Sequence, residues 1–259
     1  MGIRARGDRS RVDAAPTHLS KGILVQDLTG KVALVTGGNR GIGRGIADAL
    51  AKEGLIVAVT ARTLAHAEQA AAEIGHGARG YACDVRQWTQ VQALFAAVTK
   101  DLGGVDVLVN NAGVGVFGPI ADLSVEDWHA VIETNVNGVF YCTKLAIPLM
   151  KSRGAGYIFN VSSLAGRNAF PMAGAYCASK HAVNGFSEVL FQEVRDDGIR
   201  VTYLMPGSVA TDFGRGTAAK QDWALQPDDV GEMVVDLLHT HPRALHSRVE
   251  MRPAKPKKG

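Results

Sequence analysis

The sequence predicts a single-domain α/β fold in which a mostly parallel, doubly wound sheet is flanked by helices. From Lys31 onward, short β-branched runs alternate with helical stretches, and the connections between them are short. The expected strands are almost continuously apolar, which is typical of parallel sheets covered on both faces. The 259 residues show no internal repeat and no Pro- or Ser-rich linker, so one domain is expected.

The individual elements follow in order along the chain. The expected strands are Val32–Val35, Leu55–Val59, Ala78–Ala82, Val105–Val109, Tyr157–Val161 and Ile199–Leu204. The expected helices are Ile42–Lys52, Leu64–Ile74, Trp88–Lys100, Val125–Met150 and Ala175–Asp196. Ser124, with Asp127 three positions later, is a capping-box-like start for the long fourth helix. Pro227, followed by two aspartates, predicts the start of a last helix.

The formal net charge of +3 belongs to the two ends of the chain. Residues 1–12 hold four arginines and one aspartate, and residues 252–258 hold four basic residues and no acidic one. Residues 13–251 therefore carry a net charge of −4, which disfavours a nucleic-acid-binding body. We expect residues 1–26 to be a disordered basic extension, with a transit peptide as the alternative. Residues 252–259 are expected to form a basic tail.

Cysteine use and apolar runs bear on the setting of the protein. Cys83, Cys142 and Cys177 lack metal-ligand spacing, so no metal site is expected, and pairing would leave one over. This favours a reducing, cytoplasmic setting. No apolar run approaches the roughly 18 residues that a membrane span needs, and the N-terminus lacks the apolar segment of a secretory signal. No membrane partner is expected.

A glycine-rich loop, Thr36–Gly43, connects the first expected strand to the first expected helix. Glycines permit positive φ and let a pyrophosphate approach the main chain closely. The helix start at Ile42 offers unpaired N–H groups and the positive end of the helix dipole. The spacing is G-x-x-x-G-x-G rather than the commoner G-x-G-x-x-G, and a structural turn without a ligand is the alternative.

Four motifs, in order, resemble those of the short-chain dehydrogenase/reductase family. They are Thr36–Gly43, Asn110–Gly113, Ser163 with Tyr176 and Lys180, and Pro206–Gly207 with Thr211. The resemblance covers residues 27–251 and implies a Rossmann fold with a seven-stranded sheet. It also implies an oxidoreductase that interconverts a secondary alcohol and a ketone with a nicotinamide cofactor, working as a homodimer or homotetramer.

The resemblance further implies where the cofactor binds. The residues concerned are Gly37, Asn39, Arg40, Gly41, Ile42, Gly43, Arg62, Asp84, Val85, Asn110, Ala112, Gly113, Tyr176, Lys180, Pro206, Gly207, Val209 and Thr211. Asp84 is expected at the adenine, although an ordinary turn or N-cap residue is the alternative. Thr211 is expected at the nicotinamide amide, and Asn111 in a structural role.

The charge at the end of the second strand favours NADP(H) over NAD(H). An NAD-type unit places an acidic residue there to bind the ribose 2′-hydroxyl, whereas this chain has Ala61. Arg62 beside it and Arg40 in the glycine loop suit a 2′-phosphate. The alternative is that Arg62 is a solvated charge at a strand end.

Tyr176 and Lys180 lie four positions apart on a predicted helix and therefore share one face. Tyrosine has a pKa of about 10, and a nearby ammonium is expected to lower it, which suits a general acid and base. Ser163, after the fifth strand, is placed to bond a substrate carbonyl oxygen. The resemblance makes Asn135 the fourth catalytic position, holding a water that links the lysine to solvent. Packing and surface roles are the alternatives for each residue. Because Ser162 adjoins Ser163, Ser162 is the alternative for the catalytic serine.

The sequence indicates the substrate less specifically than it indicates the type of reaction. The resemblance places substrate contacts in Val114–Phe117, in Leu164–Phe170 and after Gly207. Arg167, Arg215 and Lys220 are candidate partners of a substrate carboxylate or phosphate, with a solvated role favoured for each. The C-terminal Ser247–Pro253 resembles the branch that acts on 3-hydroxy acids and serine, so a small 3-hydroxy/3-oxo acid is expected. A 3-oxoacyl thioester (acyl-carrier-protein) reductase and a non-catalytic NADP(H)-sensing protein are the alternatives.

Overall fold

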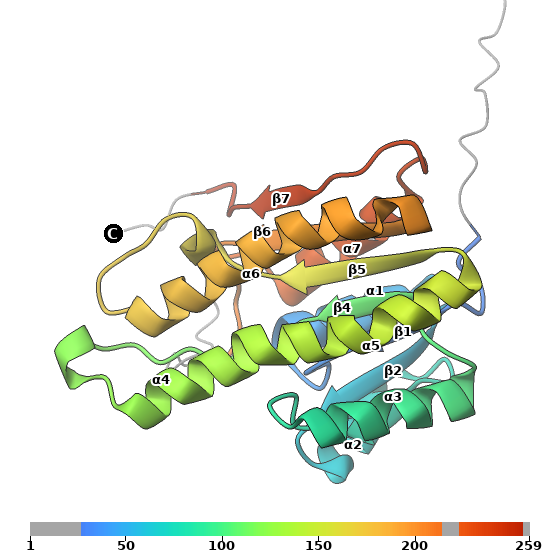
Figure 1. The fold of residues 1–259 in the computed structure, drawn as a ribbon, viewed down its shortest axis with the longest axis horizontal. Helices are drawn as coiled ribbons and strands as arrows, with labels where there is room; N and C mark the ends of the chain where they lie inside the picture. The colour runs from blue at the N-terminus through green and yellow to red at the C-terminus, as the bar shows by residue number, and fades with distance from the viewer. Residues whose placement is uncertain (1–26, 214–222, 256–259) are drawn as a thin grey trace, which may run out of the picture.

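The computed structural model describes residues 27–213 and 223–255, and a seven-stranded sheet lies at its centre (Figure 1). The strands are β1 (Val32–Val35), β2 (Ile56–Ala61), β3 (Arg79–Ala82), β4 (Val107–Asn110), β5 (Gly156–Val161), β6 (Ile199–Pro206) and β7 (Arg248–Met251). Their order is β3-β2-β1-β4-β5-β6-β7, and every neighbouring pair is parallel. The predicted doubly wound sheet is confirmed.

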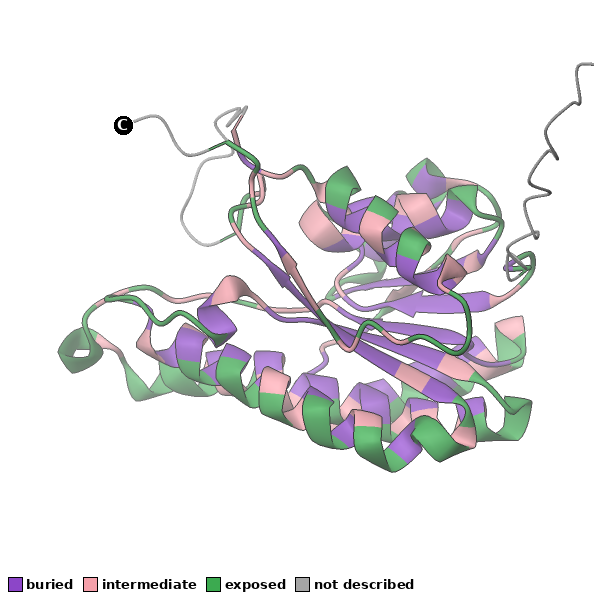
Figure 2. Cartoon of the chain, turned by 90° about the horizontal axis from the view of Figure 1, so that it is seen from above, coloured by how far each residue is buried: buried purple, intermediate pink, exposed green. Residues whose placement is uncertain are grey.

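Helices cover both faces of this sheet, and its inner strands β1, β2, β4, β5 and β6 are almost wholly buried, whereas the edge strands β3 and β7 are partly exposed (Figure 2). One face packs against α1 (Gly41–Lys52), α2 (Leu64–Ile74) and α7 (Pro227–His239). The other face packs against α3 (Trp88–Leu102), α5 (Gly138–Arg153) and α6 (Gly174–Val194). The sheet is therefore the middle of three layers.

Strand β1 shows why the expected strands are continuously apolar. Successive side chains of a strand point to opposite faces, and both faces of β1 meet a helix layer. Ala33 and Val35 belong to the core under α1 and α7, whereas Val32 and Leu34 belong to the core under α3 and α5. None of these four residues is more than 1% exposed, so a polar side chain anywhere in β1 would be buried without solvent.

The single helix predicted over residues 125–150 is wrong in one respect. The structure has α4 (Val125–Ile132), a π-helical turn η2 (Glu133–Asn137) and then α5, which continues to Arg153. Thr134 Oγ1 donates to the carbonyl of Ala130 at 2.7 Å within this stretch. The wider turn adds a residue to the helix and turns Asn135 into the interior, where 1% of it is exposed. Helical periodicity alone does not reveal such a turn.

Two predicted helix starts are confirmed by their caps. The Ser124 hydroxyl accepts a hydrogen bond from the main-chain N–H of Asp127 at 3.0 Å, which caps the N-terminus of α4. Pro227 is the first residue of α7, and Gln226 and Asp229 form a reciprocal capping box around it. This second cap holds the start of α7 in place after residues 214–222, which lie outside the described part.

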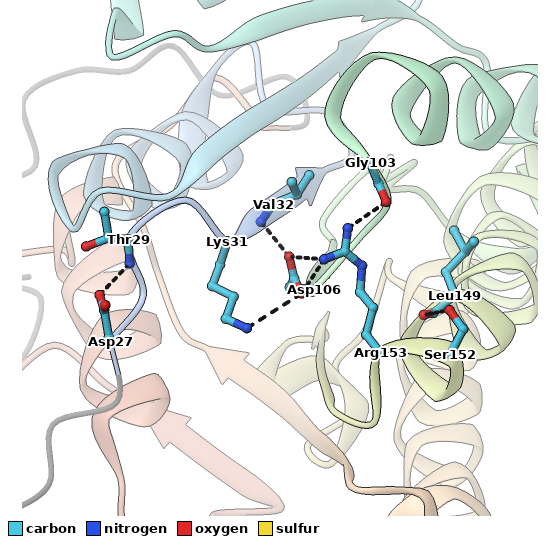
Figure 3. A network of polar contacts seen from close by, with 9 residues as sticks. All are labelled: Asp27, Thr29, Lys31, Val32, Gly103, Asp106, Leu149, Ser152 and Arg153. Atoms are coloured by element: carbon cyan, nitrogen blue, oxygen red, sulfur yellow. Dashed lines mark hydrogen bonds and ion pairs between the residues drawn. The ribbon is translucent and has the colours of Figure 1, made fainter.

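A buried carboxylate joins three elements at the amino edge of the sheet (Figure 3). Asp106, 8% exposed, accepts a hydrogen bond from the N–H of Val32 at the start of β1 (2.8 Å). It also pairs with Arg153 at the end of α5 (3.2 Å). Arg153 in turn donates to the carbonyl of Gly103 after α3 (2.6 Å). This network lies at the opposite edge from the carboxyl ends of the strands.

Some expectations concern residues outside the described part of the chain. The basic extension 1–26 and the second half of the tail, residues 256–259, belong to this group, as do Arg215 and Lys220. Of the tail, Arg252 is described, and its guanidinium pairs with Glu250 at 3.2 Å. Within the described ranges, no helix has the length and apolar character that a bilayer crossing requires.

Candidate active site

The carboxyl ends of β1 and β4 form the centre of the candidate site. The sheet order reverses between these two strands, so the chain leaves them in opposite directions and a crevice opens at their ends. Thr36 joins the two loops, because its hydroxyl accepts hydrogen bonds from the N–H groups of Asn111 (3.0 Å) and Ala112 (3.1 Å). The Asn111 amide donates to the carbonyls of Thr36 and Gly37 (2.9 and 3.0 Å), which agrees with the structural role expected for it.

The glycine loop requires its glycines at specific positions. Gly37 and Gly41 have φ values of +62° and +55°, which favour glycine. A β-carbon at Gly37 would lie 3.1 Å from the Cα of Ala112, and one at Gly43 would clash with Asn111. The two loops are therefore packed main chain to main chain, as close approach of a pyrophosphate requires.

The N-terminus of α1 is open to an anion. Arg40 at the N-cap makes no side-chain capping bond, and the first turn contains no acidic residue. Gly41 lies beside Thr211, whose methyl group would be 3.3 Å from a β-carbon there. This 12-residue helix, its unpaired N–H groups and the glycine cradle fit the pyrophosphate of a dinucleotide.

Two arginines lie exposed near the expected adenosine position. Among the described residues, neither Arg40 nor Arg62 forms an ion pair or a side-chain hydrogen bond. Ala61, the last residue of β2, is 6% exposed and brings no carboxylate to this position. The arrangement fits a ribose 2′-phosphate.

Asp84 follows β3 and is held by Arg86. Two bonds from the Arg86 Nε measure 3.0 Å, and one from its Nη2 measures 2.6 Å. Hydrogen bonds from Arg86, opposed by burial, keep the pKa of Asp84 below its usual value, and the charge of Arg62 acts in the same direction. Asp84 Oδ1 also accepts the N–H of Arg86, so the turn role exists in the structure, and adenine contact remains a prediction.

Asn110 is expected at the cofactor, but its side chain is buried and hydrogen-bonded within the protein. Its amide nitrogen donates to Thr143 Oγ1 (3.1 Å) and to Asn160 Oδ1 (2.8 Å), and 3% of the residue is exposed. The side chain therefore belongs to a polar network between β4, β5 and α5. Its amide oxygen is buried and has no hydrogen-bond partner among the described residues, and the cofactor contact of Asn110 stays a prediction.

The remaining cofactor candidates divide between core and loop. The side chains of Ile42 and Val85 pack into the two cores, so they offer mainly main-chain groups. Pro206 ends β6, and Gly207 donates its N–H to Met251 in β7 (2.8 Å). Val209 pairs with Leu225, and Asn39 is half-buried in the glycine loop.

Ser163, Tyr176 and Lys180 come together at the carboxyl end of β5. The Ser163 hydroxyl interacts with the Tyr176 hydroxyl, and the Lys180 Nζ lies 5.7 Å from the centre of the tyrosine ring. Ser162 instead bonds the Asn184 amide oxygen on α6 and is 3% exposed. The structure thus brings Ser163, and not its neighbour, to Tyr176.

The expected lowering of the Tyr176 pKa is wrong for this structure. Burial raises the pKa of Tyr176 above its usual value, and the interaction with Ser163 only partly opposes this. Lys180 is 5% exposed, and its ammonium donates to the carbonyl of Val161 at 2.8 Å. Burial lowers the pKa of Lys180 from its usual 10.5 to about 8. The helical spacing showed that the two side chains are neighbours but not how deeply both are buried.

Asn135 connects the π-helical turn to the loop after β4. Its amide oxygen accepts the N–H of Val114 (2.8 Å), and its amide nitrogen donates to the Val114 carbonyl (2.9 Å) and to Ser179 Oγ (3.0 Å). A β-carbon at Gly113 would lie 3.3 Å from the Asn135 oxygen and 3.8 Å from the Lys180 Nζ. The structure therefore brings Asn135, Gly113 and Lys180 together, and the water-holding role remains a prediction.

The sequence predicted the segments that contact the substrate, but it did not reveal that three phenylalanine rings come together in them. Phe117 and Phe213 lie beside Tyr176, with ring centres 5.6 and 5.5 Å away, and Phe170 stacks on Phe117 at 6.4 Å. Each phenylalanine comes from a different loop, so no spacing in the sequence relates them. Arg167, a candidate substrate partner, forms an ion pair with Glu250 of β7.

The comparisons with known proteins agree with this geometry. Residues 31–222 match the short chain dehydrogenase family. D-threitol dehydrogenase of Mycolicibacterium smegmatis is 41% identical over 204 residues, which is 75% of this chain and 78% of that protein. A putative ketoacyl reductase of Streptomyces coelicolor is 45% identical over 190 residues, 70% of this chain and 71% of that protein. Glycine betaine reductase ATRR of Emericella nidulans is 37% identical over 221 residues, 80% of this chain but 17% of that longer protein.

Solved structures show the same fold. A metagenomic short-chain oxidoreductase in complex with NADP is 34% identical, with a TM-score of 0.78 over 89% of this chain and all of that one. The 3-ketoacyl-(acyl-carrier-protein) reductase of Brucella melitensis, complexed with NADH, is 31% identical, with a TM-score of 0.83 over 88% of this chain and 98% of that one. This chain belongs to the short chain dehydrogenase family and is an oxidoreductase.

The buried ammonium of Lys180 predicts a pH-dependent stability. Because the folded-state pKa of about 8 lies below the usual 10.5, the cost of burying the charge is fully present below pH 8. That cost is removed as the pH rises toward 10.5. We expect Lys180→Met to be more stable than the wild type at pH 7, and this advantage to shrink by about 2 kcal/mol at pH 9.5.

Urea unfolding at the two pH values measures this difference, with Lys52→Met, an exposed lysine of α1, as the control. An advantage that is equal at pH 7 and pH 9.5 would show that the Lys180 ammonium is not desolvated in the folded protein.

Proposed function

We propose that this protein is an NADP(H)-dependent oxidoreductase that interconverts a secondary alcohol and a ketone at Ser163, Tyr176 and Lys180. The observation that carries the proposal is the meeting of these three side chains beside the glycine cradle between β1 and β4. When bound, the nicotinamide supplies a hydride to the carbonyl carbon or receives one from the alcohol.

Tyr176 is the proton donor and acceptor at the substrate oxygen. Tyrosine has a pKa of about 10 and burial raises that of Tyr176 further, so its hydroxyl is protonated at neutral pH and can donate a proton when a carbonyl is reduced. Ser163 orients the same oxygen by hydrogen bonding. Lys180, held by the Val161 carbonyl, keeps a positive charge near the phenolate that forms, which stabilises it.

NADP(H) is the cofactor that the charges favour. Arg40 and Arg62 offer two guanidiniums without ion-pair partners among the described residues, and Ala61 removes the acidic residue that would repel a 2′-phosphate. The NADP-bound relative supports this assignment, whereas the NADH-bound one shows that the fold alone does not decide between the cofactors. The local charges therefore carry this choice.

We propose two substrate classes. The expected small 3-hydroxy/3-oxo acid rests on the C-terminal segment, and the alternative of a 3-oxoacyl thioester is supported by a relative named as a putative ketoacyl reductase. A non-catalytic NADP(H) sensor would not need the Tyr176, Ser163 and Lys180 constellation. We also propose a cytoplasmic setting, which the three buried free thiols support.

The first test is NADPH oxidation with a panel of ketones, 3-oxo acids and 3-oxoacyl thioesters. We expect turnover with at least one carbonyl substrate, and Tyr176→Phe to lower kcat by at least about 100-fold because the proton donor is lost. NADPH binding, measured by fluorescence, should change little in the variant. Undiminished turnover by Tyr176→Phe would remove Tyr176 from the mechanism, and NADPH binding without turnover of any carbonyl would favour the sensor.

The cofactor preference has its own test. Arg62→Asp replaces a cation at the adenosine ribose with an anion, so we expect the KM for NADPH to rise by roughly tenfold or more. The KM for NADH should fall or stay unchanged. Arg79→Asp, the same charge change at the amino end of β3, is the matched control. Equal effects of Arg62→Asp on both cofactors would contradict a 2′-phosphate site.

We further propose a homodimer or homotetramer formed through the outer face of α5 and α6. Phe140 is 45% and Val189 54% exposed there, and Phe140 contacts Phe186 across the two helices. We expect light scattering to give a mass of two or four chains, and Val189→Glu to lower it because a charge would be buried at the interface. A wild-type mass of one chain would refute the assembly.

A further inference from the structure

We infer that the substrate carries a neutral, apolar, planar group next to its carbonyl, which packs against an aromatic wall. The aromatic wall consists of Phe117, Phe170 and Phe213. This inference rests on the proposed function, because Tyr176 fixes where the carbonyl oxygen lies. It names the substrate class that the geometry around that oxygen favours.

The aromatic wall lies directly against the proton donor. The ring centre of Phe117 is 5.6 Å from that of Tyr176 with an interplanar angle of 57°, and the ring centre of Phe213 is 5.5 Å from it at 52°. Phe170 extends the surface by stacking on Phe117 at 6.4 Å with an angle of 19°. Any group attached to a carbonyl held by Tyr176 therefore meets aromatic carbon.

These rings are exposed in the structure, whereas the rings of a cluster in the protein core would be buried. Phe117 and Phe213 are 42% exposed and Phe170 is 49% exposed, and the neighbouring Met172 is 52% exposed. A contiguous exposed apolar surface of this kind beside a reactive hydroxyl is typical of a ligand-binding surface. Aromatic rings gain further from offset or edge contacts with a planar partner.

The loops that carry the wall are tied to each other before any ligand binds. Gly118 donates its N–H to the carbonyl of Met172 at 2.7 Å, and Gly118 pairs with Ala173 as an isolated β-bridge. Met172 has a φ of +71°, an uncommon value for a residue with a side chain. A β-carbon at Gly115 would lie 2.8 Å from the Phe213 ring and 2.9 Å from the Phe117 ring. The two rings thus converge over a glycine that leaves room for them.

The charges of the described parts of these loops disfavour an anionic substrate. Arg167 is the one cation in the described residues 114–118, 164–173 and 207–213, and its guanidinium pairs with Glu250. Hydrogen bonds from Arg167 hold the pKa of Glu250 below its usual value, so this partner stays ionised. Asp212 adds a negative charge beside Phe213. The small 3-oxo acid expected from the C-terminal segment therefore finds no cation without a partner on the described wall.

The test compares three carbonyl substrates with NADPH in the full-length protein. Acetophenone is planar and neutral, butan-2-one is small and neutral, and acetoacetate is small and anionic. We expect kcat/KM to be at least about tenfold higher for acetophenone than for butan-2-one, since one aromatic contact is worth about this factor. Acetoacetate should be the poorest of the three.

Variants assign the preference to the wall. Phe117→Ala and Phe213→Ala should each lower kcat/KM for acetophenone by about tenfold, mainly through KM, and lower kcat/KM for butan-2-one by a smaller factor. Phe117→Leu, which keeps apolar volume but removes the ring, should lie between and remains available if the alanine variant fails to fold. Trp128→Ala is the matched control, because Trp128 is 41% exposed on α4, and among the described residues no ring contact joins it to Tyr176.

Two failures are distinguishable. Acetoacetate turned over as well as acetophenone, or an acetophenone preference that survives loss of the Phe117 and Phe213 rings, would overturn the inference and leave the proposed function intact. Absence of turnover with every carbonyl, or absence of NADPH binding, would overturn the proposed function and the inference with it.

Discussion

The reversal of strand order between β1 and β4 is the constraint on which the site depends. Because both strands are parallel and end at the same edge, their loops leave in opposite directions and cannot fill the space between them. Thr36 closes the bottom of this space by bonding the loop after β4, and the glycines keep its sides free of side chains. The main chain thus forms the space for a dinucleotide independently of the side chains that carry out the chemistry.

Asn135 then connects this cleft to the reacting centre. Its amide holds both main-chain groups of Val114 and reaches Ser179 on α6, so the loop after β4, the π-helical turn and the Tyr176 helix share one side chain. Lys180 lies next to the same loop, and its ammonium donates a hydrogen bond to the carbonyl of Val161. Burial around this junction changes both proton affinities, since it raises the pKa of Tyr176 and lowers that of Lys180. A tyrosine that is protonated at neutral pH suits the reduction of a carbonyl.

Most of the fold was predictable from the sequence because both faces of strands such as β1 must be apolar. The meeting of Ser163, Tyr176 and Lys180 was also predictable, since helical spacing and strand ends determine it. The π-helical turn was not, because one extra residue leaves the apolar pattern of residues 125–150 nearly unchanged. The direction of the Tyr176 pKa and the inward side chain of Asn110 depend on packing between distant segments. The aromatic wall comes from three loops with no common period.

The ion pair between Arg167 and Glu250 makes the last strand part of the substrate region. Arg167 follows the short helical turn after Ser163, whereas Glu250 lies in β7, 83 residues further along the chain. Gly207, on the third loop of the site, is bonded to Met251 in the same strand. The end of the domain therefore supports two of the loops that are proposed to contact the substrate. Changes made near the C-terminus, such as a fused partner or a trimmed tail, act close to the site that selects the substrate, although they lie far from Tyr176 in sequence.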